Sequence, residues 1–423
     1  HLITIELGLE AKDISQKRFD ENLSILFGVI KIMDVRFPLA TSTWDEKEYE
    51  SLQRVISSGM FSMGTEVSTF EKQFADYFGS KFAVMVNSGS SANLLMTGAL
   101  FYTQNKNLKL CAGDEIIVPA VSWSTTYYPL SQYGLIQKFV DIDRGTLNYD
   151  LAALESAISN NTRAIMIVNL LGNPNSFHEI RRIIKGRNIV LLEDNCESMG
   201  ATFEGKKTGT FADVGSFSTF FSHHISTMEG GMVLTDNEEL YHIMLSMRAH
   251  GWTRNLPEKN HVTGKKDKDT FKESFNFVLP GYNLRPLEMS GALGKEQLKK
   301  LPNLIKGRQD NAKIFQDKLS EHSLFTLQTE IGESSWFGFS LVLRPDTGIT
   351  RQEFANKLEN LGFECRPIVA GNFLKNPVMK HIPHTVSSNS GHLVNADYID
   401  EHGLFVGNQH YPISDAAEAL KKL

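Results

Sequence analysis

Short apolar runs rich in β-branched residues constrain the fold of this chain more than any other feature. Examples are DEIIVPA at 114–120, RAIMIVNL at 163–170 and NIVLLED at 188–194. Their apolarity is continuous rather than alternating, which is typical of strands buried on both faces of a parallel or mixed sheet. Helix-like segments such as YDLAALESAI at 149–158 lie between several of the runs. We therefore predict an α/β protein with a large, mixed, mostly parallel sheet covered by helices.

The carboxyl-terminal third follows a different pattern. A long amphipathic stretch at 285–319 leads to a strand-like WFGFSLVL at 336–343 and a helix-like EFANKLENLGF at 353–363. The chain has 423 residues, and single cores stop growing at about 250–300 residues, so two lobes are expected. The predicted division is an N-terminal extension at 1–36, a large domain at 37–290 and a small α+β domain at 291–423.

Composition excludes several classes of protein. The formal charge is −6, which argues against a nucleic-acid partner held through phosphate contacts. Three cysteines form neither an even set nor a zinc-ligand spacing, which argues against a secreted disulfide framework. The apolar stretch at 24–33 lacks a clean basic flank and a convincing cleavage site, and no apolar run reaches the length of a membrane span. We expect a cytoplasmic protein without a membrane partner, acting on a small molecule.

Two segments at predicted strand ends could hold a charged ligand. NSGSSANLL at 87–95 joins a strand to a helix start, where backbone N–H groups and the helix dipole favour a phosphate. Asp194 lies just beyond a strand, where open α/β sheets bind ligands, and a buried carboxylate there needs a partner such as a protonated heterocycle. Taken singly, both features are also explained by helix capping.

Three further segments carry aromatic, imidazole, amide or guanidinium groups. Two histidines stand side by side in SFSTFFSHHISTMEGG at 216–231. Because neighbouring residues point in different directions, we predict no metal site there. One of the two imidazoles could act as an acid or base. Trp123 follows another strand end and could stack on a flat ligand. LPGYNLRPLE at 279–288 adds one amide and one arginine. Each segment alone is equally compatible with a structural role.

The order of these five segments resembles the fold-type-I, pyridoxal-phosphate-dependent aminotransferases that act on nucleotide-linked ketosugars. The resemblance covers about residues 37–423 and implies that the large domain binds the cofactor. In that family, the lysine that anchors the cofactor stands seven residues before the first glycine of the EGG turn. Counting back from Gly230 leads to His223, not to His224. The anchoring lysine is therefore replaced by histidine.

With histidine at this position, the chain resembles the 3-dehydratases of deoxysugar biosynthesis. Met228, where many relatives have glycine, matches the same group of enzymes. An imidazole cannot form a covalent imine with the cofactor, so the resemblance implies non-covalently held pyridoxal or pyridoxamine 5′-phosphate. It also implies His223 as the acid–base catalyst, GDP-4-keto-6-deoxymannose as substrate, glutamate as amino donor and ammonia as product. Three cysteines cannot hold a four-cysteine iron–sulfur cluster, which sets aside the related iron–sulfur enzymes.

The resemblance assigns the remaining roles residue by residue. Gly89, Ser90 and Ser218 would hold the cofactor phosphate, Trp123 would stack on the ring, Asp194 would pair with the pyridinium nitrogen, and Glu197 would lie near the same face. Asn283 would reach the cofactor of the neighbouring subunit in a homodimer with a shared active site. The implied substrate residues, among which arginines suit a pyrophosphate, are Phe61, Ser62, Met63, Gly64, His250, Arg254, Arg285, Glu364 and Arg366.

Two alternatives stay open. An ordinary sugar aminotransferase would need an anchoring lysine, and Lys206 and Lys207 lie in the same lobe but not at the motif position. A catalytically silent sugar-binding relative would have lost the cofactor, which the retained Asp194, Ser218 and Asn283 argue against. The spacing of residues shows nothing about the nucleotide, so GDP comes from the resemblance alone.

Overall fold

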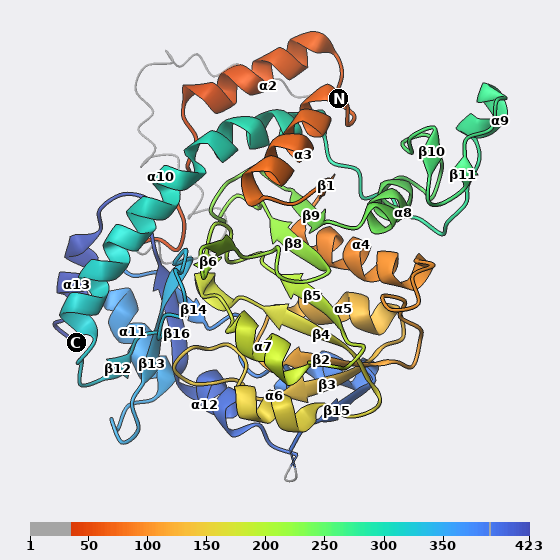
Figure 1. The fold of residues 1–423 in the computed structure, drawn as a ribbon. Coiled ribbons are helices and arrows are strands. Elements are labelled where there is room, and N and C mark those ends of the chain that lie inside the picture. The colour runs from red at the N-terminus through yellow and green to blue at the C-terminus, as the bar shows by residue number, and fades with distance from the viewer. Residues whose placement is uncertain (1–34, 389–390) are drawn as a thin grey trace, which may run out of the picture.

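A computed structural model describes residues 35–388 and 391–423, so the apolar stretch at 24–33 lies outside the described residues. An eight-stranded sheet forms the centre of the molecule, in the order β1-β9-β8-β5-β4-β2-β3-β15 (Figure 1). Only β9 runs antiparallel to its neighbours in this sheet, so the predicted mixed, mostly parallel α/β fold is confirmed. The strands are β1 Phe82–Val86, β2 Glu115–Pro119, β3 Ile136–Val140, β4 Thr162–Val168, β5 Val190–Asp194, β8 Val214–Ser218, β9 Gly231–Thr235 and β15 His384–Val386.

Both faces of this sheet are apolar, because successive residues of each strand point to opposite sides. Ala164 and Met166 of β4 pack toward α4, α5 and α8, whereas Ile165 and Ile167 pack toward α6 and α7. On the second face, α3 and α10 cover β1, β8 and β9. The helices of these layers are α2 Glu46–Ser58, α3 Thr65–Phe78, α4 Gly89–Tyr102, α5 Ser124–Gln132, α6 Leu151–Ala157, α7 Phe177–Ile183, α8 Glu238–Arg248 and α10 Glu288–Leu319.

A second, antiparallel sheet has its own core in the carboxyl-terminal part, in the order β12-β13-β16-β14. The long helix α10 runs from the large sheet to this core, where its Phe315 stacks on Phe339 of β13 at 3.8 Å between ring centroids (Figure 1). β15 follows α10 in sequence yet pairs with β3 of the large sheet. The division into domains at residues 36 and 290 stays a prediction. The elements here are β12 Phe325–Thr326, β13 Gly338–Leu343, α11 Arg351–Asn360, β14 Cys365–Pro367, α12 Val394–His402, β16 Gly403–Gly407 and α13 Ser414–Leu420.

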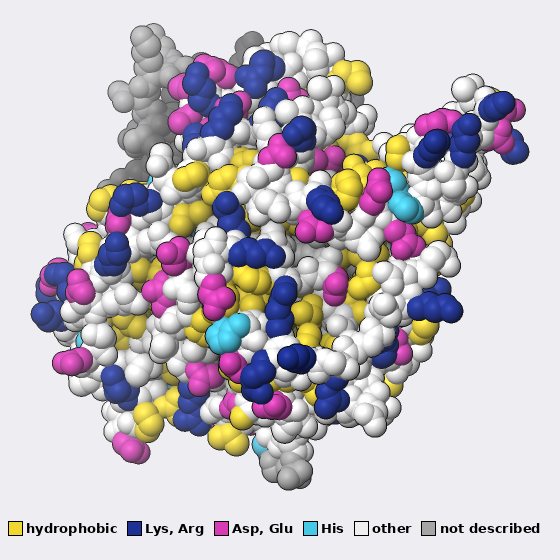
Figure 2. All heavy atoms as spheres, viewed as in Figure 1, with side chains coloured by type: hydrophobic (Ala, Val, Ile, Leu, Met, Phe, Trp, Pro, Cys, Tyr) yellow, Lys and Arg dark blue, Asp and Glu magenta, His cyan; other side chains and the backbone are white. Residues whose placement is uncertain are grey.

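The polar segment at 255–275 projects from the large lobe as an arm (Figure 1). It contains the hairpin of β10 Lys259–Asn260 and β11 Gly264–Lys265 and the short helix α9 Thr270–Ser274. Figure 2 shows basic and acidic side chains interspersed on the arm and across the visible face. None of the helices within residues 35–388 and 391–423 is both long and apolar enough to cross a bilayer.

Candidate active site

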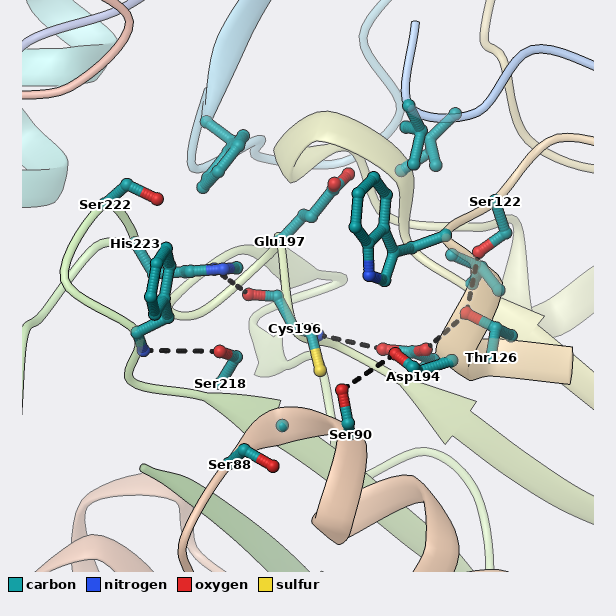
Figure 3. Close-up of a pocket in the computed structure, with 18 of the residues that line it drawn as sticks. Ser88, Ser90, Ser122, Thr126, Asp194, Cys196, Glu197, Ser218, Ser222 and His223 are labelled. Carbon is teal, nitrogen blue, oxygen red and sulfur yellow. Dashed lines mark hydrogen bonds between the residues drawn. The ribbon is translucent and has the colours of Figure 1, made fainter. Parts of the chain in front are cut away.

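A cavity of about 570 Å³ opens where β4 and β5 end, between the large sheet and the carboxyl-terminal lobe (Figure 3). This is the edge at which open α/β sheets bind ligands. The large lobe supplies the start of α4 and the ends of several strands, and the other lobe supplies Phe337, Glu364, Arg366 and Phe405. The predicted cofactor residues that line this cavity, together with His223, are Gly89, Ser90, Trp123, Asp194, Glu197 and Ser218.

Asp194 is held rigidly at the base of the cavity and is only 5% exposed. Its Oδ2 accepts hydrogen bonds from Asn93 Nδ2 and Thr126 Oγ1, both at 2.8 Å, and its Oδ1 accepts from the backbone N–H of Cys196 at 3.2 Å. These three donors occupy both carboxylate oxygens, and no basic side chain of the described residues forms an ion pair with Asp194. The site therefore suits a cationic ring nitrogen. The sequence analysis missed Asn93 and Thr126, because neither stands out from the other polar residues of its segment.

The first turn of α4 forms a cradle for an anion. Ser88 caps the helix by accepting from the N–H of Ser91 at 3.1 Å, and the first N–H groups of a helix have no partner within it. Gly89 lies so close to β8 that a Cβ there would stand 2.6 Å from Ser218 Cβ. Ser218 therefore closes one side of the cradle, and the glycine leaves the backbone accessible to a phosphate.

His223 lines the cavity and is held there through one of its two ring nitrogens. Its Nδ1 lies 2.8 Å from the carbonyl oxygen of Cys196, and because a carbonyl can only accept, Nδ1 carries the hydrogen and Nε2 carries the lone pair (Figure 3). Burial lowers the pKa of His223 to about 4, so the ring is neutral near pH 7. The ring packs on Phe337 at 5.1 Å between centroids. His224, by contrast, is fully buried, bonds to Ser335 O and does not line the cavity.

Glu197 is the second group of the cavity with a strongly shifted pKa. Its Oε2 accepts from the N–H of Leu171 at 3.0 Å, and Leu171 adopts a left-handed φ of 54° that an ordinary residue avoids. Burial raises the pKa of Glu197 to about 7, and the neighbouring Asp194 adds to that rise. Glu197 can therefore either donate or accept a proton near neutral pH. Figure 3 shows it around the same cavity as His223 and Asp194.

The structure divides the predicted substrate residues, together with the predicted cofactor residue Asn283, into two sets. Glu364 and Arg366 line the cavity. The other set, which we call the outer cluster, does not line it and comprises Phe61, Ser62, Met63, Gly64, His250, Arg254, Asn283 and Arg285.

The outer cluster is held together around Trp252, which the sequence analysis missed. His250 contacts the Trp252 ring at 5.0 Å between centroids, and the guanidinium groups of Arg254 and Arg285 lie 4.2 and 5.6 Å from its centroid. Arg285 also donates from Nε to Asn283 Oδ1 at 3.0 Å. Residues 61 and 62 are linked to the segment that follows Arg285 by backbone contacts with residues 287 and 288. The roles of both sets stay predictions.

No lysine is among the described residues that line the cavity. Lys206 and Lys207, the nearest candidates in sequence for an anchoring amine, form the short strand β7. Their Nζ atoms donate to the carbonyl oxygens of Thr210 and Tyr77, both at 2.7 Å. The amine that aminotransferases use is therefore replaced at this cavity by the imidazole of His223.

The fold and this cavity define a protein of the fold-type-I, pyridoxal-phosphate-dependent class. The chain matches the DegT/DnrJ/EryC1/StrS aminotransferase family over residues 42–407, and it belongs to that family. It is 60% identical over 391 residues to GDP-4-keto-6-deoxy-D-mannose 3-dehydratase from Yersinia pseudotuberculosis, covering 92% of this chain and 98% of the relative.

Two solved structures are similar over the same extent. GDP-4-keto-6-deoxy-D-mannose-3-dehydratase from E. coli with bound hydrated PLP is 59% identical, with a TM-score of 0.89 over 92% of this chain and 99% of that chain. A structure of GDP-4-keto-6-deoxymannose-3-dehydratase with a trapped PLP–glutamate geminal diamine shows the same identity, coverage and TM-score.

Proposed function

We propose that this protein is a pyridoxal-phosphate-dependent 3-dehydratase that converts GDP-4-keto-6-deoxy-D-mannose to GDP-4-keto-3,6-dideoxy-D-mannose. The observation that carries the proposal is His223 at the lysine position, where it lines a cavity in which no described lining residue is lysine. Glutamate donates its amino group and leaves as 2-oxoglutarate, and the nitrogen is released as ammonia. The reaction balances, because the oxygen lost from sugar carbon 3 is gained by the carbon skeleton of glutamate. The product would serve dideoxysugar synthesis of the colitose type for O-antigen.

The residues of the cavity fit the cofactor. Asp194 would hold the protonated ring nitrogen, Trp123 would cover the ring, and the cradle at Gly89 and Ser218 would hold the phosphate. When bound, the cofactor supplies an electron-accepting ring and an amine that can react with the sugar ketone. Because His223 cannot bind the cofactor covalently, non-covalent contacts such as these must provide its affinity.

Proton handling falls to His223. Its Nε2 has a free lone pair, so it can accept the proton that must leave before the hydroxyl at sugar carbon 3 departs. An imidazolium whose pKa is held low by burial gives up its proton readily, so the same Nε2 would protonate the departing hydroxyl as water. The Cys196 carbonyl fixes the ring in the orientation and tautomer that both steps need.

We further propose a homodimer in which the outer cluster completes the cavity of the partner subunit. The support is that Arg254, Arg285 and Asn283 gather around Trp252 without lining their own cavity. Mixing an inactive His223→Asn chain with an inactive Arg285→Ala chain tests this arrangement. Mixed dimers should regain activity in one of their two sites, whereas two chains that work independently should stay inactive. A cytoplasmic location is also proposed, since the three cysteines are all free.

The direct test incubates the purified protein with cofactor, glutamate and GDP-4-keto-6-deoxymannose. We expect ammonia, 2-oxoglutarate and a sugar nucleotide one oxygen atom lighter than the substrate. A 4-amino sugar without ammonia would identify an aminotransferase, and the absence of any cofactor spectrum would identify a silent binding protein. Borohydride reduction with peptide mapping adds a separate check, because a cofactor–lysine adduct contradicts the proposal.

A further inference from the structure

A buried positive charge lies behind the cavity without an acidic partner. Arg308 of α10 is 4% exposed, and its Nη1 donates to the carbonyl oxygens of Phe337 at 3.0 Å and Asn408 at 2.7 Å. None of the acidic side chains in the described part of the chain forms an ion pair with it, and its buried Nε has no protein partner there. Burial lowers the pKa of Arg308 to about 10, so it stays charged near pH 7. Proteins rarely keep a buried charge without a counter-charge, which calls for a reason.

Arg308 is connected to His223 through Phe337. The guanidinium holds the carbonyl of Phe337, and the ring of Phe337 contacts the imidazoles of His223 and His224 at 5.1 and 5.7 Å between centroids. The positive charge of Arg308 lowers the pKa of both histidines, in addition to the larger effect of burial. Asp194 on β5 acts in the opposite direction on His223. Of the other titratable groups here, His224 is itself neutral, and Glu197 lines the same cavity.

We propose that Arg308 is a positioning residue for the reaction: its buried guanidinium fixes the backbone of Phe337, whose ring packs on His223, and places beside them a positive charge that disfavours a second cation at the imidazole. This rests on the proposed role of His223 as the base. Arg308 itself neither gains nor loses a proton. The proton moves from the reacting carbon to His223 Nε2 and then to the departing hydroxyl, and the repulsion between two buried cations favours the second transfer.

The test follows the protonation of His223 directly, without turnover. The full-length, cofactor-free protein is labelled with ¹³C-histidine and titrated by NMR, and the signal of His223 is identified by its loss in His223→Asn. In the wild type we expect this imidazole to stay neutral down to about pH 5. In Arg308→Gln and Arg308→Met, which remove the charge, its apparent pKa should rise by about half a unit or more. Arg308→Lys keeps a cation and should retain most of the low value.

The variants separate charge from packing. If Arg308→Lys shifts His223 as far as Arg308→Gln does, the effect comes from the lost contacts with Phe337 and Asn408, and the electrostatic proposal is wrong. Arg344→Gln, at an arginine that donates to His322 O in the same lobe, is the matched control and should leave His223 unchanged. A wild-type His223 that titrates near 6.5 overturns the proposal even if no neutral variant folds.

The proposed function and the role of Arg308 fail separately in this design. In active enzyme, the acidic limb of the kcat profile should move toward higher pH in Arg308→Gln, and Arg308→Lys should restore it. A protein that carries out no dehydration but shows the expected NMR shifts would refute only the proposed function. Normal dehydration with an unshifted acidic limb in Arg308→Gln would refute only the role of Arg308.

Discussion

Replacing His223 with asparagine removes the proposed base but keeps the hydrogen bond to the Cys196 carbonyl. An asparagine amide can donate to the Cys196 carbonyl in place of Nδ1–H, which now makes that bond at 2.8 Å. Asparagine has no atom at the position of Nε2 and no group that titrates near neutral pH. We therefore expect the variant to fold and to bind the cofactor through Asp194 and the start of α4, but not to dehydrate the sugar.

The expected decrease in kcat of His223→Asn follows from the two proton transfers that we assign to His223 Nε2. Acid–base catalysis by a positioned side chain contributes about 10²–10⁴-fold, which corresponds to about 3–5 kcal/mol of the activation barrier. Because His223 Nε2 would both accept and donate, the loss in kcat should lie at the upper end of that range. The missing contact with the Phe337 ring should cost only about 1 kcal/mol of folding stability, since His223 is only partly shielded from solvent.

Ammonia release from GDP-4-keto-6-deoxymannose and glutamate measures the catalytic effect, and cofactor absorbance titration measures binding. The matched control is His178→Asn, which removes an exposed imidazole that does not line the cavity and should change neither quantity. Dehydration within about tenfold of wild type, or a loss accounted for entirely by weaker cofactor binding, would refute the reasoning.

Three further outcomes are expected. Asp194→Asn removes the negative charge that Asn93 and Thr126 hold in place, so cofactor affinity should fall about 10–100-fold in equilibrium titration; unchanged affinity would contradict the pairing with the ring nitrogen. Gly89→Ala would put a Cβ 2.6 Å from Ser218 Cβ, and inorganic phosphate should then compete less well with the cofactor; equal competition would place the anion elsewhere. Burial raises the pKa of Glu197 from 4.5 to about 7, so the folded state holds a proton that the unfolded chain releases in that window. The cofactor-free protein should therefore lose up to about 3 kcal/mol of stability as the pH rises through this window, and urea unfolding of Glu197→Gln should lack that loss.

Much of the large sheet could be predicted because its signal is local. Each continuous apolar run, such as residues 163–170 and 188–194, became a strand with both faces buried. Asp194 and Trp123 follow strand ends, and the carboxyl ends of parallel strands meet at one edge, so their shared cavity followed from the pattern. The pairing of β15 with β3 could not be predicted, because it joins segments about 250 residues apart through a three-residue strand without a distinctive pattern.

The residues that contact Asp194 and His223 could not be predicted from the sequence, because long-range packing brings them together. Asn93 donates to a carboxylate 101 residues away in sequence, and Phe337 reaches His223 from the other lobe. The outer cluster illustrates the same limit. The resemblance assigned its residues, apart from Asn283, to the substrate together with Glu364 and Arg366, but only the three-dimensional arrangement separates them from the cavity of their own chain.

The amino-acid order by itself determined where most strands of the large sheet form and, through the resemblance, that an imidazole stands at the position of the family's cofactor-anchoring lysine, because both depend on residue type and spacing along the chain. Only the tertiary structure decided which nitrogen of His223 is free, that its ring is neutral, and that Arg308 lies behind it without a counter-charge. The physical reason is that tautomer, protonation and electrostatic strength depend on burial and on neighbouring dipoles, and those neighbours come from segments that meet only when the chain folds.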